Sequence, residues 1–168
     1  MESRAKLAGH SVHQMLVAFP LGLLVTAAGF DLVGLAMPRG EWFPSAFYMI
    51  AVGVTAGVLA AVFGLIDWLA VPTGARAKMI GQWHGAGNAA VILLFAASWL
   101  LSRHDPAKPG MAAVVLAVLG AGAALASGWL GGELVARMGV GVDEGANLNA
   151  PSSLSGRPAG GVGKADQP

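Results

Sequence analysis

Residues 42–66 read WFPSAFYMIAVGVTAGVLAAVFGLI, a stretch without a single charged side chain. It exceeds the roughly 20 apolar residues with which a helix crosses a hydrocarbon core about 30 Å thick. Three further stretches also lack Asp, Glu, Lys and Arg: Val12–Phe30, Met79–Ser102 and Pro109–Gly132. The sequence therefore predicts an all-α fold, a polytopic membrane protein built as an antiparallel bundle of four transmembrane helices in a lipid bilayer.

The overall composition indicates the same class of protein. Hydrophobic residues make up 55% of the chain and charged residues 11%, with a mean hydropathy of +0.65, which is typical of integral membrane proteins. A net charge of +1 without a dense basic patch predicts that nucleic acid is not a partner. The absence of cysteine excludes disulfides, thiolate nucleophiles and Cys-ligated iron–sulfur clusters within the chain. No nucleotide loop, Ser/His/Asp order or paired catalytic carboxylates occur, so we expect no independent catalytic activity.

Proline and glycine divide the chain into three parts. Residues 1–10 form a short polar arm, residues 11–138 the four-helix transmembrane domain, and residues 139–168 a Gly/Pro/Ser-rich tail. The tail offers too little apolar surface to fold, so we expect it to be flexible. Every connection contains a helix terminator, for example Pro38-Arg39-Gly40 after the first helix. The predicted helices are Ser11–Met37, Ser45–Val71, Lys78–Leu101 and Met111–Leu134.

Antiparallel crossing gathers the few polar residues of these helices at one membrane face. The polar residues at that face are His10, His13, Gln14, Asp67, His84, Asn88 and Glu133. Within the helices, small residues recur on one face, as in Gly53, Gly57, Ala60 and Gly64, and small residues allow membrane helices to pack closely. The polar groups share these faces, so we expect them to point into the bundle. Any function should be sought in this layer.

His13 and His84 are the leading candidates for a site. They lie on the first and third helices at similar depth, and two neutral imidazoles from different helices can hold a b-type haem. The alternative is that each histidine only forms a hydrogen bond to a neighbouring helix or to interfacial water. A small metal site formed by His10 and His13 with His84 or Asp67 is a further option.

Asp67 and Asn88 are candidates for supporting roles around the histidines. A buried Asp67 carboxylate can orient an imidazole, relay protons or bind a quinone hydroxyl, whereas a solvated carboxylate at the end of a helix is the alternative. Asn88 follows His84 by one helical turn, and we expect it to form a hydrogen bond to the first or fourth helix. Asp31, near the opposite face, is expected to be solvated or to pair helices.

The distribution of basic residues predicts the orientation. Arg4, Lys6, Arg76, Lys78 and Arg137 flank the helix ends at the polar face, and Arg39, Arg103 and Lys108 flank the opposite ends. The positive-inside rule then places both termini in the cytoplasm.

Several motifs resemble one family of bacterial membrane proteins. The segment HQMLVAFPLGL (13–23), GLIDW (64–68), HGAGN (84–88) and GWLGGELV (128–135) with GVGV (139–142) are similar to the motifs of a four-helix family known as a domain of unknown function. Gln14 departs from the proline usual in the first motif. The resemblance covers Ser11–Val142 and implies a protein of the bacterial inner membrane. Some members of the family continue into a Rieske-type iron–sulfur domain, which implies membrane electron transfer by analogy.

Together these observations favour a redox role. The leading hypothesis is a small electron-transfer subunit that binds haem b or a quinone, with His13 and His84 as ligands and Asp67 and Asn88 beside them. It would act with a redox partner or as a homo-oligomer. The alternative is a structural or assembly protein without a cofactor, whose polar layer only pairs helices. A small proton-linked transporter is a third, weaker reading.

Overall fold

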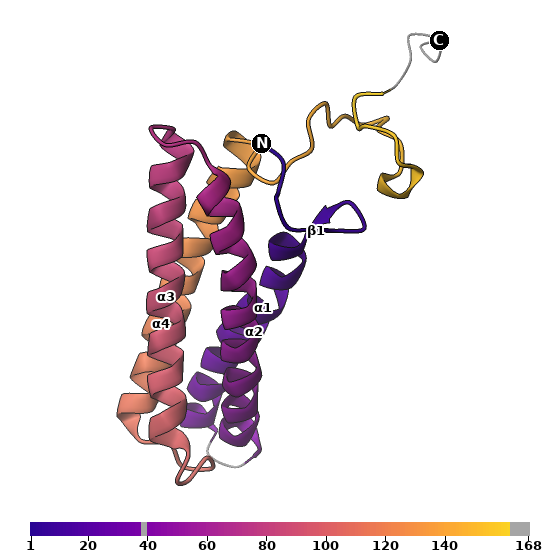
Figure 1. Ribbon diagram of the computed structural model, residues 1–168. Helices are drawn as coiled ribbons and strands as arrows, with labels where there is room; N and C mark the ends of the chain where they lie inside the picture. Colours follow the sequence, from indigo (N-terminus) through magenta and orange to yellow (C-terminus); the bar gives the residue numbers. More distant parts are fainter. Residues whose placement is uncertain (38–39, 162–168) are drawn as a thin grey trace.

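The computed structural model describes residues 1–37 and 40–161 and contains four long helices (Figure 1). They are α1 (Val12–Ala36), α2 (Trp42–Ala70), α3 (Arg76–Ser102) and α4 (Met111–Gly132). Each is long and apolar enough to cross a membrane. The prediction of an all-α, four-helix membrane protein is confirmed. Pro38 and Arg39 of the predicted first connection, and residues 162–168 of the predicted tail, lie outside the described residues.

Two helices begin earlier than the sequence suggested, and one continues further. α2 starts at Trp42 rather than Ser45, so Pro44 lies in its first turn. Proline is tolerated there because the missing N–H would have no partner within the helix. α3 starts at Arg76 rather than Lys78. α4 continues directly into a π-helical turn, Glu133–Arg137.

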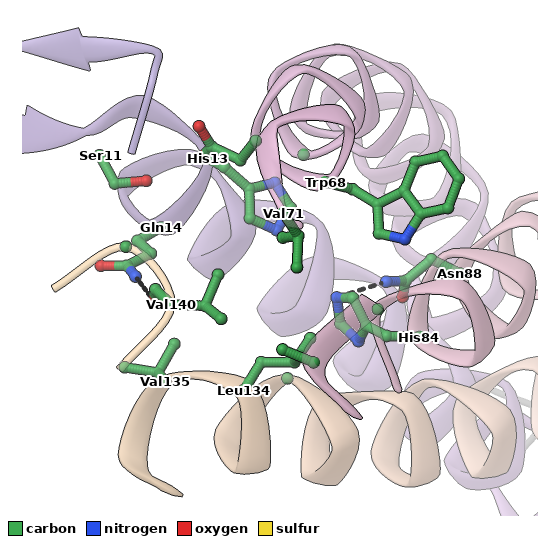
Figure 2. Close-up of a pocket in the computed structure, with 16 residues that line it drawn as sticks. Ser11, His13, Gln14, Trp68, Val71, His84, Asn88, Leu134, Val135 and Val140 are labelled. Carbon is green, nitrogen blue, oxygen red and sulfur yellow. Dashed lines mark hydrogen bonds between the residues drawn. The ribbon is translucent and has the colours of Figure 1, made fainter. Parts of the chain in front are cut away.

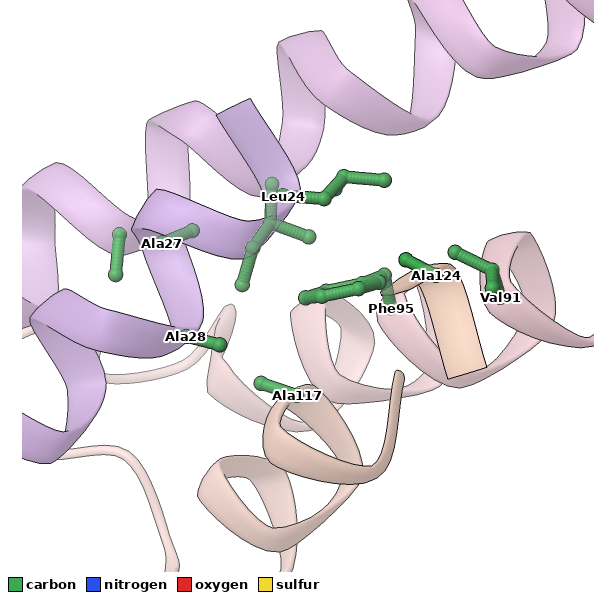
Figure 3. Close-up of a cluster of buried hydrophobic side chains, with 9 residues drawn as sticks. Leu24, Ala27, Ala28, Val91, Phe95, Ala117 and Ala124 are labelled. Atoms are coloured by element: carbon green, nitrogen blue, oxygen red, sulfur yellow. The ribbon is translucent and has the colours of Figure 1, made fainter. Parts of the chain in front are cut away.

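The helices pack as two hairpins. The most extensive contacts join α1 to α2 and α3 to α4, and smaller interfaces join α2 to α3 and α1 to α4. α1 and α3 are therefore diagonally opposite in the bundle. Phe95 of α3 is fully buried in the centre, in one cluster with Leu24 and Ala27 of α1 and Ala117 and Ala124 of α4 (Figure 3).

Glycines on α2 and α4 make this close packing possible. A Cβ atom on Gly53 would lie 2.7 Å from the Leu24 side chain, and one on Gly120 would lie 2.8 Å from Phe95. Bulkier residues at these positions would force the helices apart. The predicted small-residue faces of α2 and α4 thus lie inside the bundle, as their buried residues show.

The two hairpins repeat each other. Buried residues of α1 have buried counterparts in α3, and the residues of each pair are as far apart in the sequence as His13 and His84. Buried residues of α2 correspond to buried residues of α4 in the same way, with a second constant separation. The pairs from α1 and α3 are Leu24/Phe95, Ala27/Ser98 and Asp31/Ser102, and those from α2 and α4 are Ala46/Ala113, Gly53/Gly120 and Ala60/Ser127. Both hairpins start at the same end of the bundle, which is the arrangement of parallel repeats in membrane proteins. This duplication was not predicted.

The N-terminal arm and the start of the tail lie together at that same end (Figure 1). The arm forms a small antiparallel hairpin of β1 (Lys6–Leu7) and β2 (His10–Ser11). The Met1 ammonium donates a hydrogen bond to the Gly139 carbonyl, and the Gly141 N–H donates one to the Met1 carbonyl. Residues 139–161 contain a single 3-10 turn, Ser153–Ser155, as their regular structure.

Candidate functional site

His13 and His84 face each other across the bundle. Their ring centroids are 6.3 Å apart, and the ring planes stand at 88°. Both side chains are partly buried. They come from diagonally opposite helices and occupy equivalent positions in the two hairpins. The two imidazoles therefore face each other between the two repeated hairpins.

α2 determines the orientation of the His13 ring. His13 Nδ1 lies 2.8 Å from the Ala60 carbonyl oxygen. Because a carbonyl oxygen can only accept, Nδ1 carries a proton, and in the neutral ring Nε2 is then the atom with the lone pair. Gly64, one turn further along α2, leaves the space that the ring occupies, since a Cβ atom there would lie 2.9 Å from the imidazole.

His84 makes the same contacts with α4. Its Nδ1 lies 2.8 Å from the Ser127 carbonyl oxygen, and a Cβ atom on Gly131 would lie 3.0 Å from the ring. The Ser127 hydroxyl also donates a hydrogen bond to the His84 carbonyl at 3.1 Å. Both imidazoles therefore carry a proton on Nδ1, and each is held by the second helix of its own hairpin.

Asn88 engages His84 directly. Its amide nitrogen Nδ2 lies 3.0 Å from His84 Nε2, to which it donates (Figure 2). From the sequence we expected a hydrogen bond from Asn88 to the first or fourth helix. The amide instead reaches back one turn along its own helix, because the i and i+4 side chains of a helix lie on the same face.

The histidine pair separates two cavities. One, of about 110 Å³, lies toward the arm, and its wall includes Ser11, Gln14 and Trp68 (Figure 2). The other, of about 80 Å³, lies deeper in the bundle, and its wall includes Pro20 and Ile92. His13, His84 and Asn88 line both cavities.

Asp67 lines the first cavity but is bound to the arm. It is 7% exposed, so it is not the solvated helix-end carboxylate of the alternative interpretation. The Ser3 hydroxyl lies 2.8 Å from both carboxylate oxygens, and the Arg4 N–H donates to Oδ1 at 2.7 Å. The carboxylate thus fastens the arm to α2. Asp31, which was also expected to be solvated or to pair helices, is buried at 5% exposure.

The expected cluster of His10 with His13 does not form. α1 begins only at Val12, so His10 lies on β2 and not one turn before His13 on a helix face. Within residues 1–37 and 40–161, no group of three His, Cys, Asp or Glu side chains is placed to hold a metal ion. A bare metal ion bound by these residues is therefore not supported.

Ser11 was not recognised as a site residue in the sequence. Ser11 is 5% exposed and lines the cavity toward the arm. Its hydroxyl has no hydrogen-bond partner among the described residues. In the sequence it was only a helix start. The glycines opposite the rings were visible as small residues. A search for internal repeats would have shown the constant separation between matching residues of α1 and α3, such as His13 and His84, and the second constant separation between α2 and α4, such as Ala60 and Ser127.

Comparison with known proteins yields one match. A family model described as a predicted membrane protein, DUF2231, matches residues 9–144. No curated protein and no solved structure matches the chain.

Proposed function

The chain belongs to the DUF2231 family of predicted membrane proteins, and we propose that this member is a small electron-transfer protein that holds haem b between His13 and His84. The chain is a multi-pass membrane protein with four apolar helices. The observation that carries the proposal is the matched pair of imidazoles, both kept in the Nδ1–H tautomer by backbone carbonyls.

This hydrogen bonding is what an imidazole ligand needs. Metal-binding histidines donate their other ring N–H to a carbonyl or carboxylate, which fixes the tautomer and the orientation of the ring. Two axial histidines are enough for haem iron because the porphyrin supplies the remaining ligands. A bare ion such as zinc requires three or four protein ligands. The donor set therefore suits haem better than a free metal ion.

The space around the rings also supports haem, provided that the two hairpins can move apart. The two cavities lie on either side of the histidine pair, so a flat ring centred there would extend into both. Ligand pockets measure about 300–1,000 Å³, which exceeds either cavity. Binding therefore requires the two hairpins to move apart along the smaller α1–α4 and α2–α3 interfaces.

Haem binding also requires a change at Asn88. Its amide donates to His84 Nε2, the atom that would ligate the iron. The amide would have to turn away for Nε2 to bind iron. Haem held in this way would supply one-electron transfer, and the chain's contribution would be to orient the two imidazoles and to exclude water.

The test is an absorption spectrum of the protein purified from haem-supplemented cells. We expect an intense Soret band and sharp visible bands on reduction. His13→Ala and His84→Ala should abolish or shift these bands, whereas the control His10→Ala should not, since His10 is outside both cavities. A colourless wild-type protein would contradict the proposal and leave quinone binding, or helix pairing as in a structural protein, as the role of the histidines.

A quinone headgroup is a second candidate, favoured by the His13 imidazole in the wall of the cavity toward the arm. The cavity volume of about 110 Å³ is smaller than the roughly 150 Å³ in which an engineered protein cavity binds benzene, so the cavity would have to widen. The free lone pair of His13 Nε2 can accept a hydrogen bond from a quinol hydroxyl. The haem-free protein would then bind a soluble quinol analogue, as measured by calorimetry, and His13→Ala would abolish the heat of binding.

A further inference from the structure

The two cavities beside the histidines differ in chemistry. Apart from His13, His84 and Asn88, the deeper cavity is lined by aliphatic side chains and glycine, among them Leu21 and Leu24. The cavity toward the arm also contains polar side chains, among them Ser11, Gln14 and Asp67. A ring system that spans both would thus meet an apolar wall on one side and hydrogen-bonding groups on the other.

Ser11 provides the clearest sign of a ligand on the polar side. A buried hydroxyl without a partner costs free energy, yet Ser11 Oγ has none among the described residues. Figure 2 shows this hydroxyl turned toward the cavity. Gln14 lies beside it and uses one amide hydrogen for the Val140 carbonyl at 3.3 Å, which leaves its second N–H for another acceptor.

An arginine lies outward of these two residues. Ser11, Gln14 and Gly141 also line an outer groove of about 520 Å³ between the arm and the tail, where Arg157 forms part of the wall. The acidic residue in that groove, Asp143, is paired with Lys6. Asp67 accepts hydrogen bonds from the Ser3 hydroxyl and from the Arg4 and Ala5 N–H groups, so the arm occupies the lone pairs of its carboxylate.

Building on the proposed function, we infer that the ligand between His13 and His84 carries carboxylate groups on one edge and that this edge faces the arm. The Ser11 hydroxyl and the free Gln14 N–H would donate to the carboxylates, and Arg157 would attract them from the outer groove. Haem b has such an edge in its two propionates. Its remaining edges are apolar and suit the aliphatic wall of the deeper cavity.

The test compares two pigments that differ only at this edge. Haem and its dimethyl ester, in which both carboxylates are blocked, are titrated separately into the detergent-solubilised apo-protein, and the Soret band measures binding. We expect haem to bind at least about tenfold more tightly, since one hydrogen bond to a charged group is enough for that factor. Gln14→Glu should remove this preference by repelling the carboxylates, and Ser11→Ala should reduce it. Ser102→Ala, a buried serine at the opposite end of the bundle, is the control.

The outcomes separate the two proposals. If neither pigment binds, or if binding does not depend on His13 and His84, the proposed function fails and this inference fails with it. If both pigments bind through the histidines with equal affinity, the haem site stands and the orientation is wrong. A preference for haem that survives Gln14→Glu at full strength would also overturn the orientation, because a carboxylate placed there cannot be neutral toward a propionate.

Discussion

His13 and His84 make the same hydrogen bond in the two halves of the bundle, each donating Nδ1–H to a carbonyl 2.8 Å away on the next helix of the chain. Each ring also lies against a glycine, Gly64 or Gly131, one turn beyond that carbonyl. The site is therefore built twice by the same local contacts, and its two halves meet at ring centroids 6.3 Å apart. Such duplicated construction makes the two histidines similar in their surroundings, although Asn88 and the Ser127 hydroxyl form hydrogen bonds with His84 that have no counterpart at His13 among the described residues.

The first prediction concerns the glycines that accommodate the rings. Gly64→Ala and Gly131→Ala each place a methyl group about 3 Å from an imidazole and should lower the free energy of unfolding by about 1–3 kcal/mol, the usual cost of overpacking. Gly22→Ala and Gly122→Ala are matched controls, because a Cβ atom there meets nothing within 4 Å. Thermal unfolding in detergent measures the difference. Equal melting temperatures for all four variants would show that the rings are not confined.

The second prediction concerns the attachment of the arm. Asp67→Ala removes the acceptor for Ser3 and for the N–H of Arg4, and hydrogen bonds to a charged group contribute about 1.5–3 kcal/mol. Hydrogen exchange at Arg4 and Ala5 should accelerate by at least an order of magnitude, as measured by mass spectrometry. Asp105→Ala, in the connection at the other end of the bundle, should leave the exchange rates of these amides unchanged. Unaltered exchange in Asp67→Ala would mean that other contacts hold the arm.

The third prediction separates two parts of the tail. Truncation after Val142 keeps the contacts of Gly139 and Gly141 with Met1 and should leave membrane accumulation and thermal stability close to wild type, since the exposed Lys6–Asp143 ion pair that it removes contributes about 0–1 kcal/mol. Truncation after Met138 also removes Val140 and Gly141 from the wall of the cavity. The shorter variant should be less stable than the longer one. A large loss in the longer variant would assign a packing role to residues 143–168.

The fourth prediction concerns topology. Both termini and the connection between α2 and α3 should lie on one side of the membrane, with the connection between α3 and α4 on the other. The chain has no cysteine, so single cysteines at Thr73 and Lys108, both exposed, can be labelled with an impermeant thiol reagent. In intact cells we expect labelling at residue 108 only, with residue 73 labelled after the cells are opened. Labelling of both cysteines from the outside would contradict four crossings.

The sequence by itself determined the class of the protein and the depth of its polar residues. Stretches of about 20 or more uncharged residues can only cross the bilayer as helices, because lipid offers no partner for unpaired backbone groups. An even number of crossings then brings His13, Asp67, His84 and Asn88 to one end. The predicted helix ends differ from the observed ones by a few residues, in part because a proline in a first turn does not stop a helix.

Tertiary packing alone decided which of these residues meet. The diagonal placement of α1 and α3 turns two histidines at equal depth into a facing pair, and hydropathy carries no information on which helices are neighbours. Asp67 is at the predicted depth, yet its partners are Ser3, Arg4 and Ala5, because the arm folds back over the end of α2. The role of Gly64 likewise follows from the His13 ring packed against it. Spacing along a chain determines which residues share a face, whereas the contacts across the bundle depend on how the helices pack.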